Sequence, residues 1–345
     1  MTSVKEIAVD EPAGADTLGV ARFSFTDAYS VFDWGQMPDP IPGKGRSLCT
    51  MGAFNFERLE AEGIATHYRG VISDGETTAT QLEACDAPPR IMSFDLANVP
   101  DLPPTEDGYD YGHFHEAAGT AYVVPLEVVF RNRVPIGSSL RRRVKPGDIG
   151  LGFDNWPDEP VDLDAPLIEF STKFERSDRY LDRTEAQEIA GLAELDAIER
   201  LARDVNSVVT ERAKAMGFRH DDGKIEVVYH DGELLVADVV GTFDENRFTY
   251  DGQQVSKEVV RQFYRRFDPD WVEAVERAKA EAKDAGTHDW KGMCEIDPDP
   301  LPSDVVQLIA DFYAAGAETY TDLGLFEVDD LGTVLDRLNT TLTGR

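Results

Sequence analysis

One long helical segment followed at once by a β-hairpin constrains this fold more than any other part of the chain. Apolar residues at helical spacing continue over 184–216, with Thr184 suited to the N-cap and Gly217 to the end of the helix. Two strands are predicted next, at 224–229 and 233–239, joined by the turn His230-Asp231-Gly232. The chain therefore combines a long helix with part of a sheet in this region.

The rest of the chain extends this mixed pattern. A strand followed by a turn at Thr26-Asp27 is expected within 18–33, and further strands at 66–73 and 121–130. Helices are expected at 47–62, 256–266, 269–285 and 303–316, and loops at 100–120 and, after RNRVPIGSSLRRR, from 144 to 166. At about 100–200 residues per domain, 345 residues suggest two lobes. We expect an N-terminal α+β lobe, 1–120, with an insertion near 100–120. A C-terminal α+β lobe, 121–345, would end in a helical extension.

The charge balance excludes whole classes of partner. Lys and Arg number 34 against 66 Asp and Glu, a net charge of −32, so binding to nucleic acid or to anionic membranes through bulk charge is not expected. The longest apolar run, Tyr122–Phe130, is short and contains Glu127, and the first residues do not resemble a signal peptide. Three widely spaced cysteines predict neither a disulfide framework nor a zinc site. A cytoplasmic protein is therefore expected, with its oligomeric state left open.

Lysine is scarce in this chain. Only 10 of the 34 basic residues are lysine, and 24 are arginine. Few lysines with many carboxylates indicate a protein adapted to concentrated salt, because at molar ionic strength the Debye length is about 3 Å and carboxylate repulsion is screened. An ordinary acidic enzyme is the alternative.

The predicted hairpin places charged residues on one face. Asp222, Lys224 and Glu226 alternate along the first strand, and Asp238, at the end of the second, could meet Glu226 across the ladder. Two carboxylates beside a lysine are suited to holding Mg²⁺ against nucleotide phosphates. A solvated face of a very acidic protein explains the same spacing, and spacing alone favours this second interpretation.

Two further segments combine charged residues with glycine. In PLEVVFRNRVPIGSS, Glu127 and Arg131 share one face of an apolar strand, and the turn at Ser138 adds donors for a phosphate or carboxylate. A structural Glu–Arg bridge explains that pair equally well. In TDAYSVFDWGQMPDPIPGKG, Lys44 between two glycines could meet an anion, although GKG is a weak motif. His113 and His115 lack a third ligand and are expected to be surface residues of a loop.

The order of these segments resembles the phosphoribosylaminoimidazole-succinocarboxamide synthase (SAICAR synthetase) family. TDAYSVFD with PIPGKG, VPLEVVFRNRVPIGSSLRRR, DDGKIEV and ADVVGTFDENRF are similar to the family's motifs, in the same order, over about 1–268. The resemblance implies a two-lobed α+β fold related to ATP-grasp and kinase-like architectures, with ATP in the cleft between the lobes. It implies an ATP-dependent ligase of purine biosynthesis that joins L-aspartate to carboxyaminoimidazole ribotide (CAIR) through an acyl phosphate. Another ATP-dependent small-molecule kinase or ligase, or a binding protein whose site has decayed, is the alternative.

The resemblance also implies roles for individual residues. Catalytic positions are Asp33, Lys173 and Lys224; Mg²⁺ and nucleotide ligands are Glu226 and Asp238, with Lys5 on the nucleotide; substrate contacts are Ser30, Lys44, Glu127, Arg131, Ser138 and Arg247. Three departures concern the nucleotide side. Ala28 stands where arginine is common, Val239 replaces an acidic residue, and the first hairpin lacks a glycine beside Lys5. Segments 100–120 and 285–345 have no clear counterpart in the short bacterial form.

Overall fold

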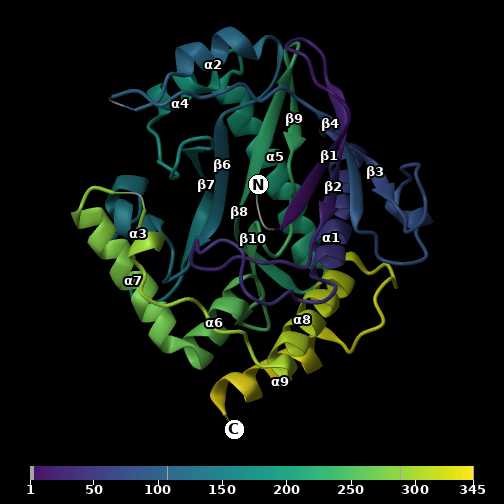
Figure 1. The fold of residues 1–345 in the computed structure, drawn as a ribbon, viewed down its shortest axis with the longest axis vertical. Helices are drawn as coiled ribbons and strands as arrows, with labels where there is room; N and C mark the ends of the chain where they lie inside the picture. Colours follow the sequence, from purple (N-terminus) through teal and green to yellow (C-terminus); the bar gives the residue numbers. More distant parts are fainter. Residues whose placement is uncertain (1–3, 107, 288, 345) are drawn as a thin grey trace.

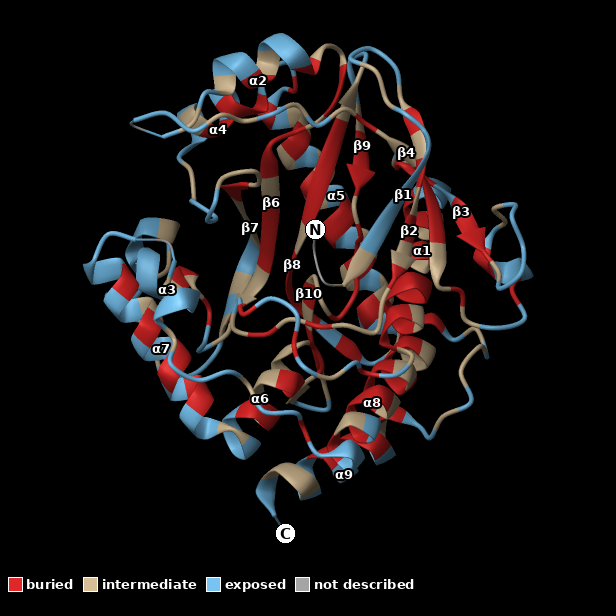
Figure 2. Cartoon of the chain, viewed as in Figure 1, coloured by how far each residue is buried: buried red, intermediate tan, exposed pale blue. Residues whose placement is uncertain are grey.

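Two antiparallel sheets form the body of the molecule, a computed structural model that describes residues 4–106, 108–287 and 289–344 (Figure 1). The first sheet has the order β1-β2-β4-β3. Its strands are β1 (Lys5–Glu11), β2 (Gly19–Phe25), β3 (Tyr68–Ile72) and β4 (Ile91–Leu96). Alternate residues of β2 are buried, because helix α1 (Lys44–Ala61) packs against β2, β3 and β4. β1 is almost wholly exposed (Figure 2).

The second sheet is built around the long strand β8. Its order is β11-β10-β8-β6-β7, and β5 and β9 also pair with β8. The strands are β5 (Ala121–Val123), β6 (Leu126–Val134), β7 (Val161–Thr172), β8 (Phe218–His230), β9 (Glu233–Ala237), β10 (Asn246–Tyr250) and β11 (Gln253–Gln254). Helix α5 (Leu195–Ala215) covers this sheet through contacts with β6, β7 and β8. Strands β6 and β8, against which α5 packs, are largely buried (Figure 2).

Helices from the C-terminal part close the lower side of the molecule. These are α6 (Glu258–Phe267), α7 (Pro269–Asp284), α8 (Ser303–Thr321) and α9 (Leu331–Thr343). α8 packs on α1 and α9, so the end of the chain is joined to the helix that supports the first sheet (Figure 1). The short elements are α2 (Tyr111–Ala118), α3 (Leu140–Arg143), α4 (Arg183–Ala190) and the 3-10 turns Leu82–Ala84, Pro146–Ile149 and Lys291–Met293. Among the described residues, no helix is both long and apolar enough to cross a membrane.

The predicted α+β class and the hairpin are confirmed. β8 and β9 pair in antiparallel register up to His230 opposite Glu233, around the turn Asp231-Gly232. The predicted strand over 121–130 is divided into β5 and β6 at Pro125, which has no N–H to donate to a ladder. The helix predicted over 47–62 begins earlier, at Lys44.

The single helix predicted over 184–216 is wrong. The structure has two helices, α4 and α5, with Asp182 rather than Thr184 as the N-cap of α4. Gly191 separates them at φ 68°, and a Cβ there would lie 2.5 Å from the His115 ring. The chain therefore has to turn where a histidine from a distant segment packs against it.

The loops predicted over 100–120 and through 166 also need correction. Residues 111–118 form α2, so His113 and His115 lie on a helix and not in a loop. The N-cap of this helix, Asp110, accepts a hydrogen bond from the His113 amide. β7 begins at Val161, because β6 offers it a ladder that local composition does not reveal. Strands β1, β4 and β10 and helix α9 were not predicted.

Candidate active site

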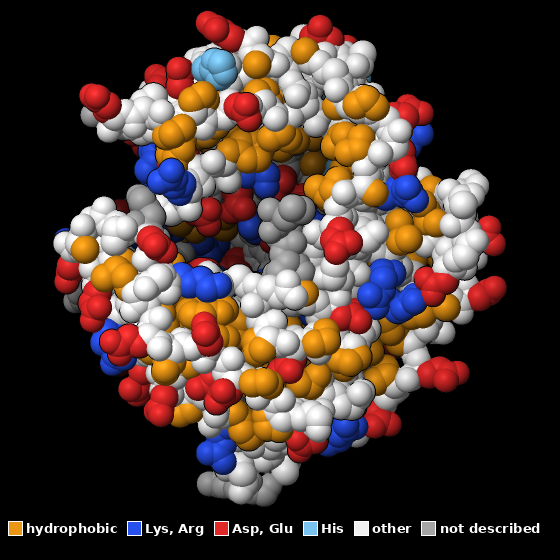
Figure 3. Space-filling view, viewed as in Figure 1, with side chains coloured by type: hydrophobic (Ala, Val, Ile, Leu, Met, Phe, Trp, Pro, Cys, Tyr) orange, Lys and Arg blue, Asp and Glu red, His pale blue; other side chains and the backbone are white. Residues whose placement is uncertain are grey.

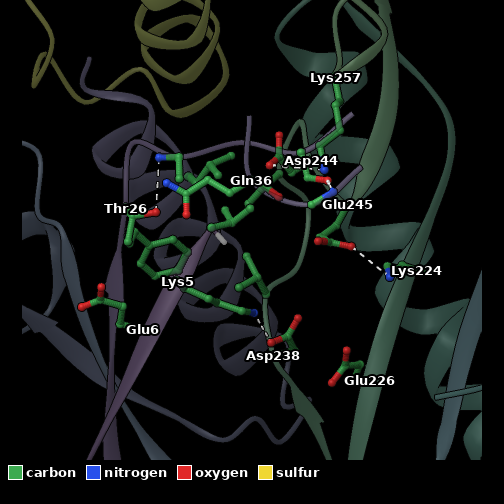
Figure 4. A pocket seen from close by; sticks show the side chains of 18 of the residues that line it. Lys5, Glu6, Thr26, Gln36, Lys224, Glu226, Asp238, Asp244, Glu245 and Lys257 are labelled. Carbon is green, nitrogen blue, oxygen red and sulfur yellow. Dashed lines mark hydrogen bonds and ion pairs between the residues drawn. The ribbon is translucent and has the colours of Figure 1, made fainter. Parts of the chain in front are cut away.

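A cleft of about 900 Å³ lies between the first sheet and β8 (Figure 3). Both sheets and the loops after β2 and β9 contribute to its walls. Four lysines and seven carboxylates from the described residues line it: Lys5, Lys173, Lys224, Lys257, Glu6, Asp33, Glu127, Glu226, Asp238, Asp244 and Glu245. Thus four of only ten lysines in the chain gather at one cavity. Several of these side chains point toward one another in Figure 4.

Glu226 and Asp238 form the centre of the site. Glu226 lies opposite Ala237 in the β8–β9 ladder, and the chain leaves β9 at Asp238 with φ 66°. This left-handed turn is tolerated by aspartate better than by most residues. Lys173 forms an ion pair with Glu226, and Lys5 forms one with Asp238. Two neighbouring carboxylates are therefore each paired with one ammonium group.

The two carboxyl groups differ in proton affinity. Burial, together with the negative charge of Asp238, raises the pKa of Glu226 above its usual value. Burial also tends to raise the pKa of Asp238, but the ammonium groups of Lys5 and Lys173 outweigh it and hold that pKa below its usual value. Because the negative charge of Asp238 raises the proton affinity of its neighbour Glu226, binding of a further positive charge between the two carboxyl groups is favoured.

Lys224 joins β8 to the opposite strand. Its Nζ lies 2.7 Å from Glu127 Oε1 on β6 and 3.4 Å from Glu245 Oε2 in the loop before β10. Burial tends to lower the pKa of Lys224, but Glu245 and Glu127 raise it above its usual value, so the lysine stays charged. Glu127 pairs with Lys224, and Arg131 pairs with Glu169, so the Glu127–Arg131 bridge considered from the sequence does not form.

The loop after β2 brings Ser30 and Asp33 to the cleft. Asp33 has φ 59°, its side chain is 81% exposed, and its Oδ2 accepts from Lys279 Nζ at 2.5 Å. Ser30 Oγ accepts from the Gly35 amide at 3.3 Å. Asp33 is therefore open to a ligand, with a cation from α7 beside it.

Lys44 lies beneath the cleft and not on its surface. Its side chain is fully buried, and Nζ donates to Asp244 Oδ2 at 2.8 Å. A Cβ on Gly45 would lie 2.5 Å from the Phe25 carbonyl oxygen, so this glycine lets α1 begin against β2. Packing at the start of α1 thus explains a glycine of the GKG segment, and Lys44 acts on the cleft through Asp244.

The predicted substrate contacts Arg131, Ser138 and Arg247 are not among the residues that line the cleft. Arg131 lies opposite Asp222 in the β6–β8 ladder, two residues along β8 from Lys224 and on the same face of the sheet. Arg131 donates to Glu169 at 2.6 Å and to Asp222 at 2.7 Å, while Arg247 Nε donates to Asp222 Oδ1 at 2.7 Å. Ser138 is buried, and its Oγ accepts from the Leu140 amide at 3.3 Å. The structure thus gathers the other predicted residues around the cleft, but not these three or Lys44.

Sequence reasoning missed four charged residues that line the cleft: Glu6, Asp244, Glu245 and Lys257. Asp244 and Glu245 lie within the segment ADVVGTFDENRF, in which only Asp238 and Arg247 were predicted as site residues. Lys257 was one of the ten lysines, and its Nζ lies 3.6 Å from Asp244 Oδ2. The scarcity of lysine was the signal that could have identified it.

The residues present fit Mg²⁺ only as a partner of a bound nucleotide. Within the described ranges, no group of three or more His, Cys, Asp or Glu side chains converges as a metal site. Glu226 and Asp238 offer two carboxylates, which is the usual protein contribution to Mg²⁺ when phosphate oxygens and waters complete its shell.

Comparison with known proteins gives consistent matches. A family profile described as SAICAR synthetase matches residues 15–278. A putative phosphoribosylaminoimidazole-succinocarboxamide synthase of Archaeoglobus fulgidus is 38% identical over 351 residues, covering 99% of this chain and 100% of that protein. A phosphoribosylaminoimidazole-succinocarboxamide synthase of Thermoplasma acidophilum is 32% identical over 314 residues, covering 87% and 92%.

Solved structures share the fold. SAICAR synthase from Saccharomyces cerevisiae, complexed with SAICAR, matches with a TM-score of 0.59 and 21% identity, covering 93% of each chain. A type-2 SAICAR synthetase in complex with ADP matches with a TM-score of 0.54 and 22% identity, covering 87% of this chain and 99% of that one.

Proposed function

The chain belongs to the SAICAR synthetase family, and we propose that its cleft joins L-aspartate to the carboxylate of CAIR at the expense of ATP. The product would be SAICAR, with ADP and phosphate released. The observation that carries this proposal is a pair of ion pairs, Lys5–Asp238 and Lys173–Glu226, inside the cleft of a chain that matches the family over 15–278.

The chemistry explains why such a site needs many charged groups. A carboxylate does not accept an amine at neutral pH, so its oxygen first attacks the γ-phosphorus of ATP and ADP leaves. The aspartate amino group then attacks the acyl carbon, the C–O bond to phosphate breaks, and the amine loses a proton. Three anionic substrates must be held in one geometry, which is where positioning and fixed charges lower the barrier.

Mg²⁺ is the finer part of the proposal. Seven carboxylates against four lysines make the lining negative, and an anionic nucleotide alone would be repelled from it. Glu226 and Asp238 would hold the metal, which when bound supplies neutralising charge to the phosphates. Lys5 and Lys173, released from those carboxylates, would then bind phosphate oxygens.

The remaining residues are proposed to act on the other substrates. Asp33 and Ser30 would contact CAIR or aspartate from the loop after β2. Lys224, together with Glu127, would orient the carboxylate of CAIR. Arg247 and Arg131 would act through Asp222, or at the phosphate of CAIR if Arg247 turns outward. Lys44 and Ser138 would support the site from beneath.

We further propose that the surface is adapted to high salt and that the enzyme works in the cytoplasm on small molecules, without nucleic acid or membrane. The net charge of −32 supports these statements. We also propose that lobes 1–120 and 121–345 are the units that enclose ATP.

An assay of ADP release tests the function. Release should require both CAIR and aspartate, and it should fall to background when either is omitted. Continued turnover of ATP to ADP without aspartate, beyond one ADP per enzyme molecule, would instead indicate a small-molecule kinase. The assay should be run at low and at molar KCl, so that inactivity caused by loss of structure is not mistaken for absence of function.

A further inference from the structure

Helix α8 presents three residues of one face to the loop that follows β9. Tyr313, Gly316 and Tyr320 are spaced three and four residues apart, so they share a side of the helix. The loop, residues 238–245, supplies five residues to the cleft: Asp238, Val239, Thr242, Asp244 and Glu245. α8 lies outside the segment 15–278 matched by the family profile.

Tyr313 contacts a residue of the cleft directly. Its hydroxyl donates to Asp244 Oδ1 at 2.9 Å, while Asp244 Oδ2 accepts from Lys44 at 2.8 Å. Lys257 lies 3.6 Å from the same Oδ2, and its side chain is 21% exposed at the cleft. The Asp244 carboxylate thus has three partners, Tyr313, Lys44 and Lys257. Figure 4 shows Lys257 reaching toward Asp244 at the cleft.

Gly316 lets the helix approach the loop. A Cβ at this position would lie 2.1 Å from the ring of Phe243, which is fully buried. The loop residue preceding Asp244 is therefore packed directly on the α8 backbone.

Tyr320 reaches the loop through one intermediate residue. Its hydroxyl donates to Asn55 Oδ1 at 2.9 Å, and Asn55 Nδ2 lies 3.3 Å from the carbonyl oxygens of Val240 and Gly241. Gly241 has φ 70°, and a Cβ there would lie 2.2 Å from the Asn55 amide. These bonds hold the backbone two and three residues after Asp238.

We infer that α8 is a positioning element of the active site, with Tyr313 as the positioning residue for Asp244 and Lys257. This inference rests on the proposed function. Without the Tyr313 hydroxyl, the Asp244 carboxylate would lose one of its three donors, and the Lys257 ammonium would no longer have a fixed location. Displacements of about 1 Å in a substrate-positioning group lower rates by up to about 100-fold, so a measurable loss of turnover follows.

Three single-atom deletions test the inference: Tyr313→Phe, Tyr320→Phe and, as a matched control, Tyr122→Phe. The Tyr122 hydroxyl is buried and donates to Ala190 O at 2.7 Å, remote in sequence from the loop and outside the cleft lining. We expect Tyr313→Phe to lower kcat about tenfold with KM for ATP changed less than about threefold, because the geometry and not the binding surface is altered. Tyr320→Phe should have a smaller effect of the same kind, and Tyr122→Phe should lower only the melting temperature.

Amide hydrogen exchange of residues 238–246 gives a readout that does not depend on turnover. It should become faster in Tyr313→Phe and Tyr320→Phe but not in Tyr122→Phe. An unchanged kcat in Tyr313→Phe, or loop exchange no faster than in Tyr122→Phe, overturns the inference. If the wild-type protein released no ADP with CAIR and aspartate, the proposed function would fail, and loop exchange would still decide whether α8 holds the loop.

Discussion

Lys5 on the first strand contacts Asp238 at the end of β9, 233 residues away in the sequence. The contact brings β1, which is otherwise exposed, over the Asp238 carboxylate in the cleft. A strand that is tied to the rest of the cleft by an ion pair can exchange that pair for a nucleotide phosphate. This ion pair therefore connects the first sheet to the residues proposed to hold Mg²⁺.

Asp238→Asn and Glu226→Gln should each lower kcat by about 100-fold or more, because each removes charge stabilisation in a partly dry cleft. Folding should change little, as checked by melting temperature. Asp10→Asn, at an exposed pair with Arg22, is the matched control and should retain activity. Wild-type turnover by folded Asp238→Asn would remove this residue from the mechanism.

Arg247→Lys should raise KM for CAIR about tenfold while KM for ATP stays unchanged, since lysine cannot reproduce two hydrogen bonds to Asp222. Arg131→Lys should in addition lower stability, by about 3 kcal/mol, because a buried guanidinium paired with Glu169 and Asp222 is lost. Steady-state kinetics and urea unfolding separate the two effects. An increase in KM for ATP alone would require the two ligands to be exchanged.

His220 should make stability depend on pH. Asn246 Nδ2 donates to its Nε2 at 2.9 Å, so Nδ1 carries the proton and donates to Thr210 Oγ1 at 2.8 Å, which describes a neutral ring. Burial lowers the pKa of His220 from 6.5 to about 4, so the unfolded state binds the extra proton between these values. The free energy of unfolding should therefore fall as pH decreases from about 6.5 to 4, by about 3 kcal/mol from this residue.

Urea unfolding of the wild type and of His220→Gln across this pH range isolates that contribution from those of the carboxylates. The variant should be less stable at pH 7 but should lose less on acidification. Parallel pH profiles for the two proteins would show that His220 is not held neutral.

The hairpin and the relation of Glu226 to Asp238 could be predicted because period-two alternation and a two-residue turn are local signals. The break between α4 and α5 could not, since apolar spacing continues through it and its cause, the His115 ring, comes from another element. The pairing of Arg131 was also hidden, because its partners Glu169 and Asp222 lie on two other strands. The sequence shows which residues are charged, but which charged residues pair with one another depends on the register of the strands.

Salt should stabilise this protein. The Debye length is about 10 Å at 0.1 M and about 3 Å at 1 M, so repulsion among surface carboxylates is largely removed in molar KCl. We expect a higher melting temperature and higher activity in molar KCl than in dilute buffer, although salt weakens substrate attraction. The stabilising effect should dominate because it sums over many carboxylates. A melting temperature that is unchanged or lower in molar KCl would show that the acidic surface is not a salt adaptation.

The central claim is that a carboxylate of CAIR is phosphorylated in this cleft before aspartate attacks it. CAIR labelled with ¹⁸O in its carboxylate, incubated with ATP and aspartate, tests this most directly by mass spectrometry of the phosphate. Attack on the γ-phosphorus leaves a CAIR oxygen bonded to that phosphorus, and the later C–O cleavage releases it. One ¹⁸O atom per phosphate, formed together with SAICAR, is the predicted result; SAICAR accompanied by unlabelled phosphate would contradict the acyl-phosphate route.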